Sequence, residues 1–204
     1  EKDKTLKNYK DMFIKITKND IDATKKLIQT IGLRYYTAKN EADELCASMV
    51  INGFAWACLS EDMDMFVYGC PRILRYASFI KETAILYDHS GILERLNIDL
   101  DTFKDLCILC GTDYNMGIDN IYKLYSKYKT YVKDDIKTPY LHWIFSTVYK
   151  NTNKINVGLV KKIFTVTDNV DDKIEINQSI TTRGDFKIDE LKSFLSDYDF
   201  IFLG

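Results

Sequence analysis

Two carboxylate pairs of identical spacing are the residues of this chain best suited to chemistry. Glu41-x-Asp43 and Asp62-x-Asp64 lie on either side of a short amphipathic run and an apolar run. Carboxylates that converge repel one another strongly unless a positive charge lies between them. Hard cations such as Mg²⁺ or Mn²⁺ prefer oxygen ligands of this kind. The two pairs together therefore predict a metal site.

The first pair also has a simpler interpretation. Acidic residues are common in the first turn of a helix, because the helix dipole favours negative charge there. Glu41-x-Asp43 alone is therefore typical of a capping feature. Asp62-x-Asp64 is more informative, because buried strands seldom end in clustered acids.

The elements around these pairs predict how they are placed. Asn40 can cap a helix whose apolar residues recur at helical spacing, and Gly53 can end it. The continuous apolar run 54–59 is typical of a parallel strand buried on both faces. Asp62 and Asp64 then follow the C-terminal end of that strand, where open parallel sheets bind their ligands.

The rest of the chain alternates between the two kinds of element. Apolar periodicity predicts helices at about 1–16, 20–31, 88–96, 102–110 and 188–198, and strands at 33–36, 72–76 and 84–87. This alternation predicts an α/β fold with a parallel sheet. Strand signals fade after Asp113, so helices are expected to dominate to about residue 162. Residues 163–187 are expected to form a loop with one short strand.

Bulk composition excludes several classes of protein. The 204 residues are 46% apolar and carry a net charge of −2, so one sizeable domain without a global basic signature is expected. No apolar run reaches the ~18 residues of a membrane span. The five cysteines are odd in number and lie in or beside apolar runs, which indicates a reducing compartment and not a disulfide framework. Cys107-x-x-Cys110 could be half a zinc site, but two buried thiols are favoured because no second cysteine pair accompanies them.

One segment departs from the weak acidity of the whole chain. Residues 120–162 hold nine lysines and two aspartates, with six interleaved tyrosines. A basic surface with aromatic residues suits a phosphate backbone. A solvated lysine face over a tyrosine-lined core explains the same pattern, so both interpretations stay open.

Three stretches in register resemble the flap endonuclease (XPG-like) 5′ nucleases: residues 41–47, 60–71 and 105–114. Residues 12–37 also look like the helix and strand that enter that family's internal domain. The resemblance implies a PIN-like/5′ nuclease parallel sheet flanked by helices. A mostly helical C-terminal part with a degenerate helix–two-turn–helix should follow. Residues 1–115 would be the internal nuclease region, and 116–204 the helical DNA-binding and C-terminal part of the same domain.

The resemblance also implies a reaction and the residues that perform it. The family hydrolyses DNA phosphodiesters at junctions of single and double strands during replication or repair, using two Mg²⁺ ions for which Mn²⁺ can substitute. Asp62 would lie near both ions, Asp43 near one, and Asp64 and Asp113 near the other. Glu41 would act through water. The lysines expected to contact DNA are Lys123, Lys127, Lys129 and Lys133.

Two departures from the family pattern carry expectations of their own. The family's N-terminal portion supplies two further aspartates and a basic arch, which nothing before Glu1 provides. That portion is therefore expected in cis or in trans, with this chain a fragment or a processed form. The glycine turn of the helix–two-turn–helix is replaced by residues 120–122, so the duplex contact should shift to the lysines.

The remaining expectations concern partners and alternatives. DNA is the expected partner, without a membrane or a sliding-clamp peptide, in the nucleus or another DNA-replicating compartment such as a viral replication site. A catalytically silent nucleic-acid-binding relative and a PIN-type ribonuclease stay open as alternatives. A haloacid-dehalogenase-like phosphatase is disfavoured, because Ser60 and Glu61 separate the strand from Asp62 and Met65 follows Asp64.

Overall fold

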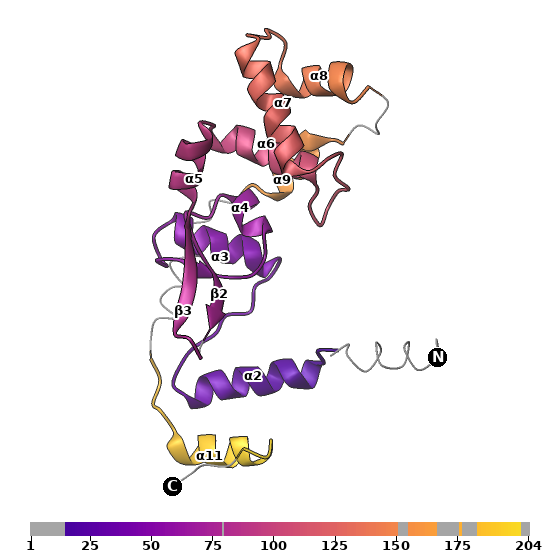
Figure 1. Ribbon diagram of the computed structural model, residues 1–204. Coiled ribbons are helices and arrows are strands. Elements are labelled where there is room, and N and C mark those ends of the chain that lie inside the picture. The colour runs from indigo at the N-terminus through magenta and orange to yellow at the C-terminus, as the bar shows by residue number, and fades with distance from the viewer. Residues whose placement is uncertain (1–14, 79, 151–154, 167–175, 177–182, 201–204) are drawn as a thin grey trace, which may run out of the picture. The chain divides into compact units, whose positions relative to one another are not determined.

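The chain divides into two compact units, each described here by itself. The computed structural model describes residues 15–78, 80–150, 155–166, 176 and 183–200 (Figure 1). The first unit combines residues 1–37 with 169–204, and the second spans residues 38–168. The predicted division at residue 115 falls in the connection between two helices of the second unit. The helix predicted at 1–16 and most of the loop and strand predicted within 163–187 lie outside the described residues.

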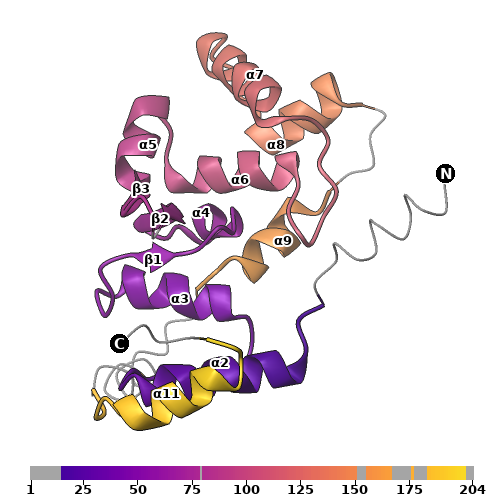
Figure 2. The same ribbon diagram turned by 60° about the horizontal axis from the view of Figure 1, so that its bottom comes forward.

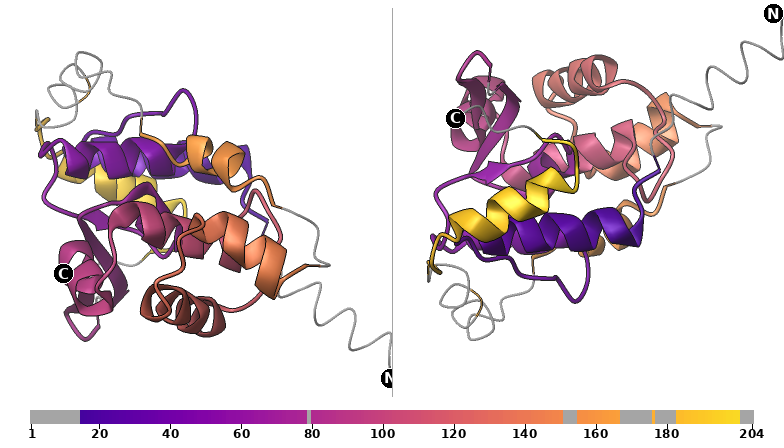
Figure 3. Two further views of the ribbon diagram at one scale, coloured as in Figure 1. Left: turned by 90° about the horizontal axis from the view of Figure 1, so that it is seen from above. Right: turned by 90° about the horizontal axis from the view of Figure 1, so that it is seen from below.

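Two helices form the described part of the first unit, α2 (Lys18–Thr30) and α11 (Ile188–Ser196), which pack side by side (Figure 3). Thr17 and Asp20 cap α2 with a reciprocal capping box. The Gly184 amide donates to the Gly32 carbonyl at 2.9 Å. A Cβ atom on Gly32 would lie 2.6 Å from the Gly184 oxygen, so this close approach requires glycine.

The strand predicted at 33–36 is wrong. These four residues belong to no sheet, and the side chains of Leu33, Tyr35 and Tyr36 are exposed. An apolar run of this length becomes a strand only where another strand pairs with it, and no strand of the described residues pairs with this one.

A three-stranded sheet lies at the centre of the second unit. Its strands are β1 (Cys58–Leu59), β2 (Arg72–Ser78) and β3 (Thr83–Asp88), in that order. β1 and β2 are parallel, whereas β2 and β3, both labelled in Figure 1, are antiparallel. The predicted strands at 72–76 and 84–87 and the α/β class are confirmed. The sheet is mixed and not wholly parallel, because a short connection joins β2 to β3 and such connections favour antiparallel pairing.

The strand predicted at 54–59 is much shorter than expected. The amides of Phe54 and Ala55 still donate to the Met49 carbonyl at 2.9 and 3.0 Å, so the chain is still closing the preceding helix. Sheet pairing begins only at Cys58. Trp56 and Leu59 are 62% and 59% exposed, so the run is not buried on both faces.

Four helices contribute to the core of the second unit, while the side chains of β3 stay mostly exposed. These helices are α3 (Ala42–Ile51), α4 (Asp64–Tyr68), α5 (His89–Leu96) and α6 (Leu100–Cys110). α3 packs against β1 and α4, and α4 packs against α6 (Figure 2). Asn40 does not cap α3: Glu41 occupies the N-cap position without a side-chain hydrogen bond. The most deeply buried side chains include Met65, Ile73, Leu106 and Ile108.

Helices dominate after Asp113, as predicted. α7 (Ile121–Lys133), α8 (Tyr140–Trp143), a π-helix (Ile144–Val148) and α9 (Val157–Ile163) follow one another. The Asn120 side chain accepts from the Lys123 amide at 3.1 Å, so residues 120–122 form the cap and first turn of α7 and not a separate turn. In the described part of the chain, no helix is both long and apolar enough to cross a bilayer.

Candidate active site

Asp62 lies in the tight loop between β1 and α4, and Asp64 is the first residue of α4. The Ser60 amide donates to the Leu74 carbonyl at 3.1 Å, which extends the contact with β2 by one residue beyond β1. The Asp64 amide then donates to Oδ1 of Asp62 at 2.8 Å. Such a bond from a short side chain to a nearby amide stabilises a turn. The turn fixes both carboxylates directly after the strand, as the sequence predicted.

A buried arginine holds this loop from the neighbouring strand. Nη2 of Arg75 donates to the Glu61 carbonyl at 2.8 Å, and its Nε lies 3.4 Å from Oε2 of Glu61. Nη1 of Arg75 contacts the sulfur of Met63. The other carboxylate oxygen of Glu61 accepts from the Tyr76 amide at 2.6 Å. The acidic loop is thus bonded to β2 on both sides of Asp62.

Sequence reasoning missed Arg75 and Glu61, although one signal was present. Arg75 follows Ile73 by two residues in β2, so the two side chains share a face of the sheet. Both are buried, with Arg75 9% exposed. A charged residue in a buried strand position predicts an ionic partner, because an unpaired buried charge is costly.

The first acidic pair reaches the site from α3. Glu41 occupies the N-cap position of this helix and Asp43 lies in its first turn. Negative charge in this place is favoured by the helix dipole, as the simpler interpretation required. Asp43 also interacts electrostatically with Asp62 and Asp113, which a capping role alone does not explain.

Asp113 comes from the loop that follows α6. Thr112 and Asn115 pair across this loop, and the Ile118 amide returns to the Leu109 carbonyl at 2.8 Å. A Cβ atom on Gly117 would lie 1.8 Å from the Cys110 oxygen, so the loop closes only with glycine there. This closure places Asp113 beside Asp64: burial raises the pKa of the Asp64 carboxyl most, the charge of Asp113 raises it further, and the Asp113 backbone lowers it.

The carboxylates raise one another's proton affinity. Burial, followed by the charges of Asp62, Glu41 and Asp113, raises the pKa of Asp43 above its ordinary value. Burial, followed by the charges of Asp62 and Asp113, raises the pKa of Asp64 to about 6. Acids from α3, from the segment at the start of α4 and from the α6–α7 loop thus interact electrostatically with one another.

The acids have the oxygen ligands that a metal site needs, but their spacing is a separate question. Carboxylate oxygens are the ligands that hard divalent cations prefer, and nearby positive charge would relieve the repulsion described above. Among the described residues, however, no three His, Cys, Asp or Glu side chains lie close enough together to hold a metal ion. Direct ligation by these five acids therefore stays a prediction.

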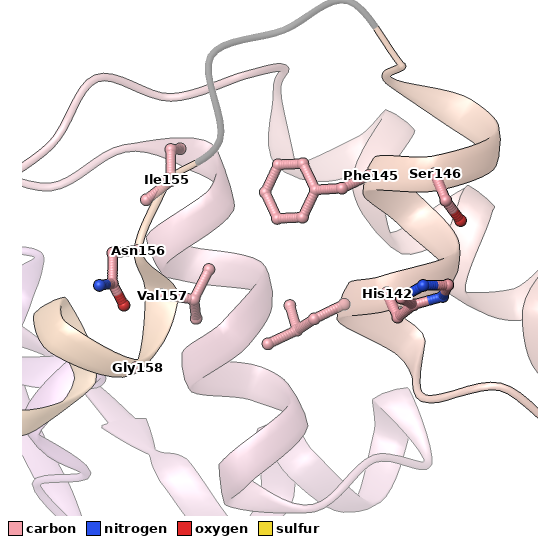
Figure 4. A pocket seen from close by; sticks show the side chains of 8 residues that line it. His142, Phe145, Ser146, Ile155, Asn156, Val157 and Gly158 are labelled. Atoms are coloured by element: carbon pink, nitrogen blue, oxygen red, sulfur yellow. The ribbon is translucent and has the colours of Figure 1, made fainter.

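An apolar cavity opens beside Asp64. Its volume is about 430 Å³, and its walls come from α4, β3, α5 and α6, with Phe66, Tyr87 and Phe103 among them. A second cavity, of about 290 Å³, lies elsewhere in this unit, between the π-helix and the start of α9 (Figure 4). Phe145, Ile155 and Val157 form its apolar wall, and it contains none of the predicted acids.

The four predicted DNA-contacting lysines all lie on the exposed side of α7. On the opposite side of α7, Leu124 is fully buried. The Tyr125 hydroxyl donates to the Leu96 carbonyl at 2.8 Å. Lys123 pairs with Asp119 at 3.1 Å, and Nζ of Lys129 lies 4.9 Å from the Tyr125 ring centre. The exposed positions are Lys123, Lys127, Lys129 and Lys133. Contact of these lysines with DNA stays a prediction, since a solvated face has the same appearance.

The region that contains the acidic motifs is similar to known proteins. Residues 32–113 match the family model of the XPG I-region. Flap endonuclease 1 of Methanococcus aeolicus is 38% identical over 99 residues, which are 48% of this chain and 30% of that protein. Flap endonuclease 1 of Zea mays is 38% identical over 111 residues, which are 53% of this chain and 29% of that protein. The chain thus spans about three-tenths of the length of these relatives.

Solved structures agree on the fold. Flap endonuclease-1 from Methanococcus jannaschii matches with a TM-score of 0.59 and 24% identity, covering 90% of this chain and 60% of the other. The catalytic core of Rad2 in complex with DNA substrate matches with a TM-score of 0.63 and 19% identity, covering 94% of this chain and 68% of the other. These comparisons confirm the resemblance inferred from the motifs. Residues 32–113 are therefore similar to the XPG I-region, and the chain shares its fold with flap endonuclease-1 from Methanococcus jannaschii.

Proposed function

We propose that this chain is the internal and C-terminal portion of a metal-dependent, structure-specific 5′ nuclease. Its substrate would be DNA at a junction of single and double strands, and it would act in replication or repair. One observation carries the proposal: Asp43, Asp62, Asp64 and Asp113 all lie within the matched residues 32–113 and interact electrostatically in the structure.

The acids would hold two divalent ions, Mg²⁺ or in its place Mn²⁺. Asp43, Asp62, Asp64 and Asp113 are the proposed direct ligands, and Glu41 would act through water. Bound ions of this kind polarise the attacking water and balance the negative charge on the scissile phosphate. The chain's own contribution is placement, because the Arg75 contacts and the Asp62 turn fix the loop before any ligand arrives.

DNA would be held by charge and not by sequence. The exposed lysines of α7 suit phosphate contacts, which set the position of a duplex without reading its bases. The relatives are about three times as long as this chain's matched region, which supports a further N-terminal nuclease portion supplied in cis or in trans. We place the activity in a DNA-replicating compartment, nuclear or viral.

Cleavage of a labelled 5′-flap DNA tests the proposal. The chain would be joined with the N-terminal portion of a flap endonuclease, with Mg²⁺ present, and compared with its Asp62→Asn variant. The variant should lose cleavage by at least about 100-fold while remaining folded, because it removes one acid from a mutually repelling group. Asp197→Asn, an exposed change at the end of α11, is the matched control and should cleave normally. Unchanged turnover by the Asp62 variant would remove the basis of the proposal.

One observation favours a second candidate, a catalytically silent DNA-binding relative. No three potential ligands among the described residues are close enough to share a metal ion. In that case calorimetry would detect no Mg²⁺ or Mn²⁺ binding that Asp62→Asn abolishes, although flap DNA would still bind. A PIN-type ribonuclease would instead cleave the matched RNA flap in preference to the DNA flap.

A further inference from the structure

One tyrosine of the basic segment 120–162 differs from the other five. Tyr122 lies in the first turn of α7 and is 85% exposed. In the part of the chain that the structure describes, its hydroxyl has no hydrogen-bond partner and its ring contacts no other ring or cation. Packing within the second unit therefore does not explain an aromatic residue at this position.

The fold does account for the other five tyrosines. Four of their hydroxyl groups donate hydrogen bonds within the second unit: Tyr125 to the Leu96 carbonyl, Tyr131 to the Thr138 carbonyl, Tyr140 to the Leu124 carbonyl and Tyr149 to the Asp119 carboxylate. The ring of Tyr128 packs edge-on against that of Tyr140, with ring centres 5.2 Å apart. A tyrosine-lined core thus explains five of the interleaved tyrosines and leaves Tyr122 for a different role.

Tyr122 shares one face of α7 with two lysines. Ser126, Lys129 and Lys133 follow it at i+4, i+7 and i+11, the spacing of a single stripe along an α-helix. All four side chains are exposed. Lys129 lies about 10 Å and Lys133 about 16 Å along the helix axis from Tyr122, since each residue adds about 1.5 Å. The opposite side of α7 is used for packing, because Leu124 is fully buried there.

The charge of α7 indicates what this stripe can bind. The helix, Ile121–Lys133, contains four lysines and no Asp or Glu. Lys123 pairs with Asp119 at 3.1 Å, whereas Lys129 and Lys133 lie on the stripe itself. Cations in a line attract successive phosphates, and an exposed aromatic ring offers a flat face to a base. An exposed ring followed by two cations is therefore complementary to a single strand of nucleic acid.

We propose that Tyr122 stacks on an unpaired base of a DNA strand whose phosphates lie against Lys129 and Lys133. The inference deepens the proposed nuclease function and rests on it only for the identity of the partner as DNA. In a duplex, neighbouring base pairs cover the faces of each base, so Tyr122 contributes only where the DNA is single-stranded. The lysines act on both forms, because both carry phosphates. Tyr122 thereby lets α7 distinguish unpaired from paired DNA.

Two physical signatures separate the ring from the lysines. Stacking of one base on an aromatic side chain strengthens binding by at least about 5-fold. The stacked ring carries no charge, so its removal should leave the salt dependence of binding unchanged. Each lysine–phosphate contact to a single strand, in contrast, contributes about 0.7 to the slope of log affinity against log salt.

Fluorescence anisotropy of the 204-residue chain in EDTA, where no metal-dependent cleavage occurs, tests the proposal. The probes are a labelled oligothymidine and a labelled duplex of equal length, each titrated at several salt concentrations. Tyr122→Ala should weaken oligothymidine binding at least about 5-fold, with the salt slope and the duplex affinity unchanged. Tyr122→Phe should bind like the wild type, and Tyr122→Leu, which is apolar but has no ring, should bind like Tyr122→Ala.

Two further measurements exclude a merely structural effect. Tyr36→Ala, which changes an exposed tyrosine of the first unit, is the matched control and should bind both probes normally. Because Tyr122 is exposed, circular dichroism should give the same melting temperature for its variants as for the wild type. Irradiation of a complex with oligothymidine that carries one 5-iododeoxyuridine should link the DNA to the peptide that contains Tyr122.

The outcomes for stacking and for cleavage are distinguishable. No binding of oligothymidine by the wild type, an unchanged affinity in Tyr122→Ala, or equal losses on both probes would overturn the stacking proposal. A chain that binds oligothymidine through Tyr122 but cleaves no flap once completed would refute the nuclease function alone. Cleavage with an unchanged affinity of Tyr122→Ala for oligothymidine would refute the stacking alone.

Discussion

At the scale of single residues, Asp64 is the group whose titration should be visible in stability. Its folded-state pKa is about 6 against an ordinary value of 3.8, because burial and neighbouring acids disfavour its charge. Between these values the folded chain binds more protons than the unfolded chain. The contribution of Asp64 to stability should therefore rise as pH falls from 7 towards 5, since the slope follows the difference in bound protons.

Melting the metal-free chain in EDTA at pH 7.5 and pH 5 measures this effect. Burial lowers the pKa of His89, so this residue opposes Asp64 over the same pH range, while Asp99 and Asp119, whose pKa values are lowered by hydrogen bonds, oppose it only as pH falls towards 4. The change in melting temperature from pH 7.5 to pH 5 should therefore be less favourable in Asp64→Asn than in the wild type. Asp197→Asn is a suitable control. Equal pH dependence in wild type and Asp64→Asn would contradict the assigned cause.

The residue scale also shows what sequence alone can and cannot provide. The place of Asp62 and Asp64 after a strand was predictable, because the apolar run that contains the strand directly precedes them in the sequence. The interaction of Asp113 with Asp64 depends on how the loop after α6 closes at Gly117. The sequence does not show this closure, because it brings together residues of different elements. Arg75 was missed because its partner Glu61 is 14 residues away and belongs to another element.

At the scale of elements, β2 should stabilise the acidic loop through Arg75. Replacing Arg75 by Met keeps much of its length but removes one hydrogen bond to the Glu61 carbonyl and an ion pair with the exposed Glu61 carboxylate. One charge-assisted hydrogen bond contributes about 1.5–3 kcal/mol and an exposed ion pair adds little, so a loss of about 2 kcal/mol in the free energy of unfolding is expected. For a chain of this size that corresponds to a fall of about 4–8 °C in melting temperature.

Arg72 provides the matched control within the same strand. Its Nε donates to the Trp56 carbonyl at 2.5 Å, outside the acidic loop. Arg72→Met should change stability without changing the affinity of the acidic loop for Mn²⁺. A Mn²⁺ titration, followed by the relaxation of water protons, measures this affinity. Weaker Mn²⁺ binding in Arg75→Met alone would support a positioning role, and equal weakening in both variants would refute it.

The basic face of α7 makes its own prediction. Changing Lys127, Lys129 and Lys133 together to Ala should weaken binding equally for unrelated duplex sequences, because phosphate contacts carry no sequence information. The slope of log affinity against log salt should flatten by about 0.9 for each lost contact, or about 3 in all. Fluorescence anisotropy at several salt concentrations measures both. The exposed residues Lys15, Lys18 and Lys81, changed likewise, provide a charge-matched control, and identical slopes for the two triples would identify α7 as a solvated face.

Helices and strands were predictable where the local sequence alone, such as apolar spacing and a terminating glycine, determined them. The helix at 102–110 was found within two residues of its start, because apolar spacing and Gly111 mark it clearly. The apolar run 54–59 was misjudged because it resembles a buried strand. Whether such a run forms a strand depends on tertiary pairing, and here only Cys58 and Leu59 pair with β2.

At the scale of the whole molecule, the mixed sheet could not be derived from alternation of elements. Strands joined by a helix favour parallel pairing, but β2 and β3 are joined by only a few residues and pair antiparallel. The class of fold and the helical second half were nevertheless predictable, since both follow from periodicity over long segments. The residues from 167 to 182, where the sequence was polar and irregular, are mostly outside the described structure.

The last prediction concerns the activity of the chain by itself. The 204 residues should fold, because the core formed by Met65, Ile73 and Leu106 lies within the second unit. They should nevertheless cleave a 5′ flap poorly, because the described acids do not by themselves form a three-ligand group. An incomplete metal shell would remove positioning and charge stabilisation, which are worth several kcal/mol in such sites.

Single-turnover cleavage of a labelled flap by the isolated chain, with Mg²⁺ and then with Mn²⁺, measures this directly. Adding the N-terminal nuclease portion, fused or in trans, should raise the rate by at least about 100-fold, because each 1.4 kcal/mol restored to the transition state is worth a factor of ten. Asp62→Asn in the completed protein should return the rate to that of the isolated chain. Robust cleavage by the 204 residues alone would instead show that the described acids form a complete site once metal is bound.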